Sequence, residues 1–175
     1  MATFTKRIDA TIRDIDHMFD GSSWTCLDGA YSLGNPGLVT RNSSFRFTGV
    51  NIPQGATINS AKITLRTTTT DGSLNVVLKM EGVDADNTAE FITSPESSAR
   101  TRTHTTANVG WTISSETSGA DIDSPNIGSI VQEIVDRAGW SSGNAMAFWV
   151  SDNGSTSGDA IDVEEYTTST TLCAL

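Results

Sequence analysis

Histidines that could activate a serine or cysteine nucleophile are scarce in this chain. Its 175 residues include two histidines, His17 and His104, and the sequence contains no G-x-S-x-G, H-E-x-x-H or phosphate-binding glycine pattern. Carboxylates are plentiful enough to be paired as in glycosidases, but no spacing singles out one pair. Two such pairs are Asp84 with Glu133 and Asp162 with Glu165. We therefore expect a protein that is not an enzyme.

Loops rich in oxygen ligands are the pattern that could hold a metal ion. Asp84 and Asp86 lie in the segment DADN, and Asp152 and Asp159 flank a second polar loop. Carboxylate and amide oxygens on loops are the ligands that calcium takes in proteins. The alternative is that Asp and Asn only form turns here, which they do often. We expect no cofactor beyond this candidate structural calcium.

Four aromatic residues are candidates for a platform on which a sugar ring could stack: Trp24, Trp111, Trp140 and Tyr166. Such a platform needs an exposed ring with polar groups beside it. A tryptophan in the middle of a strand or beside a helix end is more often part of the core. The sequence alone leaves both interpretations open.

The charge balance excludes two classes of partner. Eleven Lys and Arg stand against 21 Asp and Glu, which gives a net charge of -10. Binding to nucleic acid or to an anionic membrane needs clustered positive charge, so we expect neither partner. A surface this acidic repels copies of itself except where a specific contact is built.

The two cysteines and the first residues bear on where the protein is made. Cys26 and Cys173 could pair if the first and last strands are neighbours, although two buried free thiols are the interpretation we favour. Residues 1–7 lack an apolar run, so we expect no secretory signal, and no segment reaches transmembrane length. Synthesis in a host cytoplasm is the expectation.

A helix followed by a buried strand is the clearest pattern in the chain. Large apolar residues recur at helical spacing between Ser124, a candidate N-cap, and Gly139, which predicts a helix near residues 125–137. Residues 145–150 are apolar on both faces, and this is typical of a central strand covered on both sides. We expect the helix to provide one of these covers.

Short alternating segments separated by Gly-rich turns occupy most of the remaining chain. The segments 61–69 and 74–80 flank Asp71-Gly72, which predicts a hairpin. The overall pattern favours an all-β fold: an antiparallel β-sandwich of jelly-roll-like form with a single helix. We assign residues 1–43 to an N-terminal strand and loop segment and residues 44–175 to the sandwich module, within one domain overall.

Several stretches resemble a known group of modules: FRFTGVNIPQGATINSA at 45–61, RTRT at 100–103, WT at 111–112, Ser124-Pro125, IVQEIV at 130–135 and GWSSGNA at 139–145. They are similar to β-sandwich modules of bacterial surface proteins and of tailed-phage structural proteins. The resemblance covers residues 44–150 and implies a fold like that of jelly-roll carbohydrate-binding modules. Residues 1–43 lie outside it.

Two functions follow as expectations. The first is a virion structural protein, a capsid decoration (cement) protein or another exterior protein of a tailed phage, with a homo-oligomer (a trimer favoured) and the major capsid protein as partners. The alternative is a carbohydrate-binding or adhesion module of a bacterial surface protein, located outside the cell. If the N-terminal segment reaches another subunit, assembly is favoured; if it completes the sandwich, a glycan-binding module is favoured.

Overall fold

The computed structural model describes residues 3–6, 15–18, 24–25, 31–91 and 99–164, without the side chains of 15–18, 24, 25 and 31. Its fold is all-β with a single α-helix among the described residues, as the sequence predicts. The elements are β1 (Ile15–Met18), β2 (Trp24–Thr25), β3 (Tyr31–Gly34), β4 (Asn42–Phe47), β5 (Thr64–Arg66), β6 (Val76–Val83), η2 (Ala99–Thr101), β7 (His104–Ile113), β8 (Asp121–Asp123), α1 (Gly128–Val135), β9 (Met146–Asp152) and β10 (Ala160–Val163).

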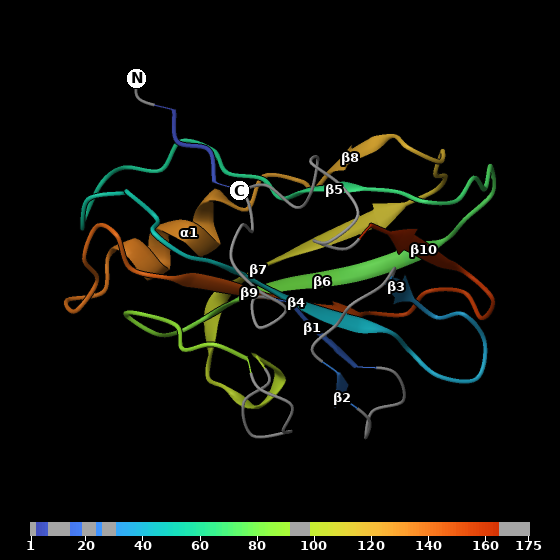
Figure 1. The fold of residues 1–175 in the computed structure, drawn as a ribbon, viewed down its shortest axis with the longest axis horizontal. Helices are drawn as coiled ribbons and strands as arrows, with labels where there is room; N and C mark the ends of the chain where they lie inside the picture. Colours follow the sequence, from blue (N-terminus) through green and yellow to red (C-terminus); the bar gives the residue numbers. More distant parts are fainter. Residues whose placement is uncertain (1–2, 7–14, 19–23, 26–30, 92–98, 165–175) are drawn as a thin grey trace.

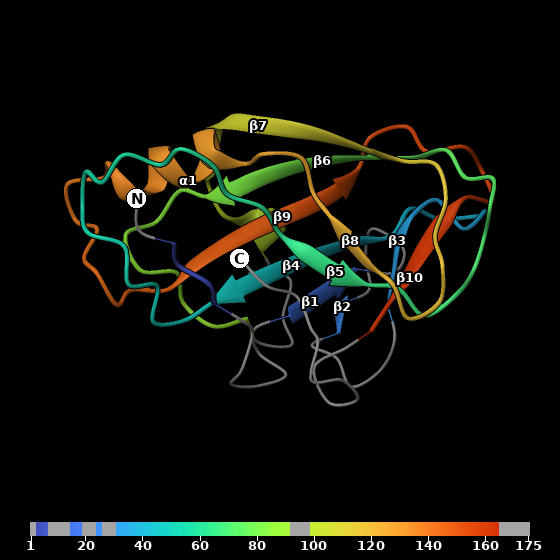
Figure 2. The same cartoon turned by 90° about the horizontal axis from the view of Figure 1, so that it is seen from above.

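One layer of the molecule is a six-stranded antiparallel sheet with the order β2-β1-β4-β9-β6-β7. Figure 2 shows these strands fanning across the molecule, with β7 along one margin. The strand β9 lies between β4 and β6, with Phe148 opposite Phe45 and Val150 opposite Met80. The prediction of a central strand at this point of the chain is therefore confirmed.

The opposing layer consists of the pairs β5-β8 and β3-β10 (Figure 1). An antiparallel bridge between Thr67 and Val163 and a 2.8 Å hydrogen bond from Glu164 N to Arg66 O connect the two pairs. The order in this layer is thus β8-β5-β10-β3. Together the two layers form the antiparallel β-sandwich that the sequence predicts.

The main core lies between the two layers. Phe45, Phe47 and Phe148 are fully buried there, and the rings of Phe47 and Phe148 meet edge to face with centroids 6.0 Å apart. A smaller cluster covers the opposite face of β9, where Ala147 and Trp149 pack with three other residues: Val83, Phe91 and Ala99. Both faces of β9 are therefore removed from water.

The helix is shorter than predicted, and it covers β6 and β7 instead of the central strand β9. It begins at Gly128 without a side-chain cap, because Ser124 Oγ instead accepts a 2.9 Å hydrogen bond from Ile63 N. Its apolar face is buried as predicted, but it packs mainly on β6 and β7 rather than on β9. Gly82 in β6 makes this contact feasible, because a Cβ there would lie 2.8 Å from Ile130 and Ile134.

The predicted hairpin at Asp71-Gly72 is wrong. The segment before it enters β5, which pairs with β8, whereas the segment after it enters β6, which pairs with β7 and β9. Asp71 and Glu116 exchange backbone hydrogen bonds of 2.7 and 3.0 Å. The turn residues are present, but the chain uses them to cross between the two layers.

The described strands of the N-terminal segment are part of the sandwich. β1 pairs with β4 along four residues, β3 pairs with β10, and the predicted boundary at residue 43 falls inside β4. Residues 3–6 form no strand, and residues 7–14, Cys26 and Cys173 lie outside the described residues. Within the described part of the chain, no helix has the length and apolar character needed to cross a bilayer.

Gly82→Ala should lower the free energy of unfolding by about 1–3 kcal/mol, because the added methyl group overpacks the contact between α1 and β6. Gly72→Ala is the matched control, since a Cβ there meets no atom within 4 Å. Urea unfolding measures both changes. Equal stability of the two variants would contradict this account of how the helix packs.

Candidate functional site

Two of the four predicted platform residues are buried. Trp111 is 5% exposed and Trp140 is 2% exposed, and both belong to the main core. The indole nitrogen of Trp140 donates a 2.9 Å hydrogen bond to Ile52 O, which accounts for its polar group. Neither ring presents a face to solvent. The side chain of Trp24 is not described, and Tyr166 lies outside the described residues.

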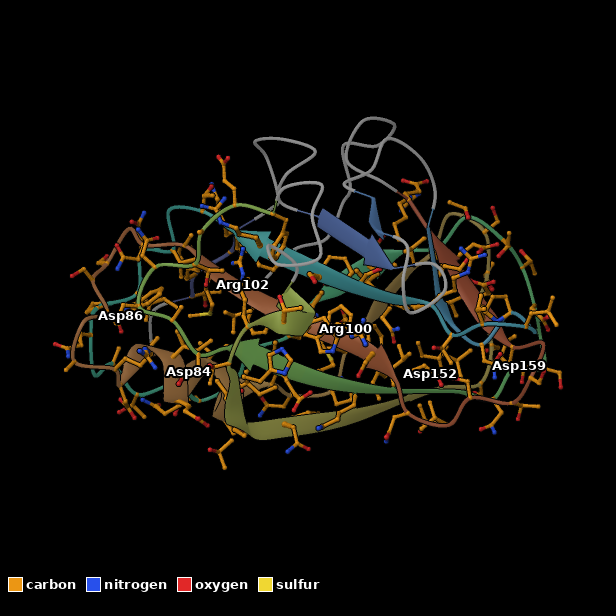
Figure 3. All side chains as sticks on the ribbon, turned by 90° about the horizontal axis from the view of Figure 1, so that it is seen from below. Asp84, Asp86, Arg100, Arg102, Asp152 and Asp159 are labelled. Atoms are coloured by element: carbon orange, nitrogen blue, oxygen red, sulfur yellow. The ribbon has the colours of Figure 1, made fainter. Side chains whose placement is uncertain are left out.

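The four predicted calcium ligands are not brought together. Figure 3 shows Asp84 and Asp86 at one end of the molecule and Asp152 and Asp159 at the opposite end. The described residues contain no group of three or more His, Cys, Asp or Glu side chains that could hold a metal ion. The two loops therefore do not contribute to one common site in the described structure.

Asp84 and Asp86 both bind Arg137, which follows the helix. Arg137 Nε donates a 2.7 Å hydrogen bond to Asp86 Oδ1, and Arg137 Nη1 donates to Asp84 Oδ1. The hydrogen bond to Asp86 is the largest cause that raises the pKa of the guanidinium. A side chain at Gly139 would collide with the Asp86 carboxylate, so this glycine leaves room for the ion pair. The cluster fastens the loop after β6 to the end of α1.

Asp152 and Asp159 fasten their own loop. Asp152 Oδ1 and Oδ2 accept hydrogen bonds from Ser155 N at 3.2 Å and Gly154 N at 3.3 Å. Asp159 Oδ2 accepts a 2.7 Å hydrogen bond from Asn75 N. These carboxylates act here as acceptors for backbone amides, which is the turn-forming alternative to calcium.

A groove of about 800 Å³ lies beside the N-terminal residues. Its walls are residues 3–5, the loop 51–61 and parts of β5, α1 and the segment before α1, and Phe4 packs against the main core from this side. Its lining combines apolar groups with amide and hydroxyl groups, and Asn51, Asn59 and Asn126 supply side-chain amides. A mixed lining of this kind suits a small polar ligand with an apolar face.

The free margin of β7 is a feature that the sequence interpretation missed. Val77 C=O accepts a hydrogen bond from Asn153 N (2.8 Å), and Val77 N donates to Ser155 Oγ (2.9 Å). The backbone N–H and C=O of Val77 are therefore directed toward the β9 side of β6. Because backbone groups alternate in direction along a strand, the N–H and C=O groups of Leu78 and Met80 are directed toward β7. Their partners Trp111 and Val109 are then the hydrogen-bonded residues of β7.

The residues between these partners direct their N–H and C=O groups away from the sheet. They are Asn108, Gly110 and Thr112, all exposed, and we call their outward backbone groups the β7 margin. Within the described chain, no hydrogen bond satisfies these groups. None of the five residues from Asn108 to Thr112 is charged.

Glu133 closes one end of this margin. The register of β6 and β7 shifts between Glu81 and Val83, and at this bulge the amides of Thr106 and Ala107 donate to the two Glu133 carboxylate oxygens at 2.7 and 2.8 Å. The helix that covers β7 thus also caps its edge. No sequence signal marks Glu133 for this role, because the bulge depends on strand register.

Glu116 is a buried acid that the sequence interpretation also missed. It is 5% exposed, and Thr69 Oγ1 donates a hydrogen bond to its Oε1. Burial is the largest cause that raises its pKa, and the nearby carboxylates of Asp162 and Asp71 act in the same direction. Among the described residues, its Oε2 has no hydrogen-bond partner.

Of the two carboxylate pairs considered for glycoside cleavage, the structure describes both members of one, Asp84 with Glu133. Asp84 binds Arg137 and Glu133 caps β7, whereas Glu165 lies outside the described residues. Of the two histidines, His104 contacts Ala99 O through Nε2 at 2.8 Å and lies 3.7 Å from Glu81 through Nδ1. The side chain of His17 is not described.

Comparison with protein families and with curated proteins adds no relative. No protein-family model matches the chain. No curated protein matches its sequence either.

Arg137→Gln should lower the free energy of unfolding by about 1–2 kcal/mol, because two charge-assisted hydrogen bonds are lost and two carboxylates are left without their cation. Lys62→Gln is the control. Lys62 pairs with Asp123 at an exposed position, where the expected change is within about 0.5 kcal/mol. A loss no larger than that of the control would show that the loop does not depend on Arg137.

Glu116→Gln should stabilise the protein at pH 7. A carboxyl whose pKa is raised by folding destabilises the folded state when ionised, and this cost disappears as the pH falls and the folded state takes up the proton. The variant should therefore exceed the wild type at pH 7, and the difference should shrink toward pH 4.5. Thermal unfolding between pH 4 and 8 measures this. The exposed Glu90→Gln is the control, and a difference that grows on acidification would reverse the assignment.

Proposed function

We propose that this chain is a non-enzymatic structural protein of a tailed-phage virion, a capsid decoration (cement) protein or another exterior protein. It is made in the host cytoplasm, binds the major capsid protein on the particle surface, and works by shape and contact.

The observation that carries this proposal is the β7 margin on an otherwise acidic sandwich. Carboxylates at several loops are engaged within the chain, as Arg137 and the amides of the β9-β10 loop illustrate. Along the β7 margin, the described surface offers a macromolecular partner an uncharged row of backbone donors and acceptors. Such a row binds another strand by main-chain hydrogen bonds, which is assembly by contact.

A second candidate, a carbohydrate-binding or adhesion module of a bacterial surface protein, is favoured by a different observation. The described part of the N-terminal segment completes its own sandwich, since β1 lies between β2 and β4 and Phe4 packs on the main core. The groove beside residues 3–5 would then take the sugar, with its amide groups bonding hydroxyls.

The test uses capsids from a phage that lacks the gene for this chain. These capsids should bind the purified protein, and the amount of protein that sediments with them should reach saturation. Gold-labelled antibody against the chain should then mark the outer surface of the particles in electron micrographs. A glycan array is the parallel measurement. Protein that stays in the supernatant while it binds a glycan would refute the virion proposal and support the adhesion module.

A further inference from the structure

Gly110 occupies a position where none of the described residues around it requires a glycine. Its backbone has no left-handed conformation, and a Cβ built on it would meet only Leu78 O, at 4.0 Å. Gly82 differs, because the helix side chains fill the space beside it. A glycine inside a strand weakens that strand and often marks a place where another backbone approaches closely. At the centre of the β7 margin, no described strand of this chain occupies that place.

We propose that the β7 margin binds the same margin of a second copy of this chain, antiparallel, with Gly110 on the two-fold axis. In this register, Gly110 faces Gly110 of the second copy, and Asn108 faces Thr112. All three positions direct their N–H and C=O groups outward, so each facing pair exchanges two hydrogen bonds. The two six-stranded sheets become one continuous sheet across the dimer.

The local chemistry suits a self-complementary contact. Two strands of a chain with net charge -10 would repel one another if their facing residues were acidic, but residues 108–112 are Asn, Val, Gly, Trp and Thr. Asn opposite Thr is a neutral polar pair, and Val109 comes opposite the Trp111 position in the second copy. The cap that Glu133 places on Thr106 and Ala107 ends the pairing on that side and so limits its register.

This inference rests on the proposed role in assembly and makes it specific. A two-fold contact between identical margins closes on itself and gives a dimer. The trimer expected from the sequence stays a prediction that would require a different surface.

Two matched double variants test the register. Asn108→Lys with Thr112→Lys places like charges opposite one another in the proposed dimer, whereas Asn108→Lys with Thr112→Glu places opposite charges there. We expect the lysine pair to weaken dimerisation by about tenfold or more and the mixed pair to retain it. Light scattering and sedimentation velocity over a range of concentrations, with wild type as reference, measure the effect. Thermal unfolding verifies that both variants fold.

The comparison isolates the contact from general electrostatics. The lysine pair makes the chain less acidic, which by itself would favour association, so its weakening of the dimer can come only from charges placed face to face. Gly110→Pro is a further variant, because it removes an outward N–H at an edge where proline costs no ladder hydrogen bond. It should also dissociate the dimer.

Several outcomes would overturn the inference. They are a wild-type monomer at every concentration, a trimer, a dimer indifferent to the lysine pair, and equal weakening by both double variants. A monomer whose capsid binding is lost in the lysine-pair variant would assign the β7 margin to a capsid strand instead. In that case the inference fails while the proposed virion function stands. Loss of capsid binding by the wild type itself would overturn the function.

Discussion

The constraint on which the rest of the fold depends is that β9 must be covered on both faces. Its inward residues Met146, Phe148 and Val150 are fully buried between the two layers, and Ala147 and Trp149 are buried on the outer face. A strand of this composition would be unstable at a margin or with one face in water, because each large apolar side chain loses about 1.5–3 kcal/mol when it is exposed. Its neighbours β4 and β6 and the segments around Phe91 and Ala99 follow from this requirement.

Covering a sandwich on several sides uses side chains that could otherwise have formed a site. Trp111 and Trp140 fill the core, and Arg137 draws Asp84 and Asp86 to the end of the helix. The loops are long and polar, so they contribute little apolar burial of their own, and hydrogen bonds and ion pairs hold them in place. In this molecule, the four candidate calcium ligands are hydrogen-bond acceptors that fasten loops, and the two described candidate platform residues, Trp111 and Trp140, fill the core.

The parts of the fold that the sequence predicts are those with a local cause. The buried face of α1 and the central strand β9 both follow from spacing and composition. Strand pairing is different, because Asp71-Gly72 forms a turn whether its flanking segments pair with each other or separate. The preference of β6 for β7 and β9 depends on apolar residues that are distant in sequence. For the same reason, the roles of Ser124, Glu133 and Arg137 were out of reach, since each depends on a partner from another element.

The β7 margin shows how an acidic protein could still associate with itself. At physiological salt the Debye length is about 8 Å, so charges farther apart than this are largely screened, and the repulsion between two copies in contact comes mainly from the charges near that contact. What decides the contact is the set of groups that actually meet, and along Asn108 to Thr112 these are uncharged. Where carboxylates line the surface, a contact between two copies brings like charges together. Acidity thus disfavours other orientations and leaves the neutral margin as the orientation of least repulsion, so a contact of a few backbone hydrogen bonds can be specific without a large apolar patch.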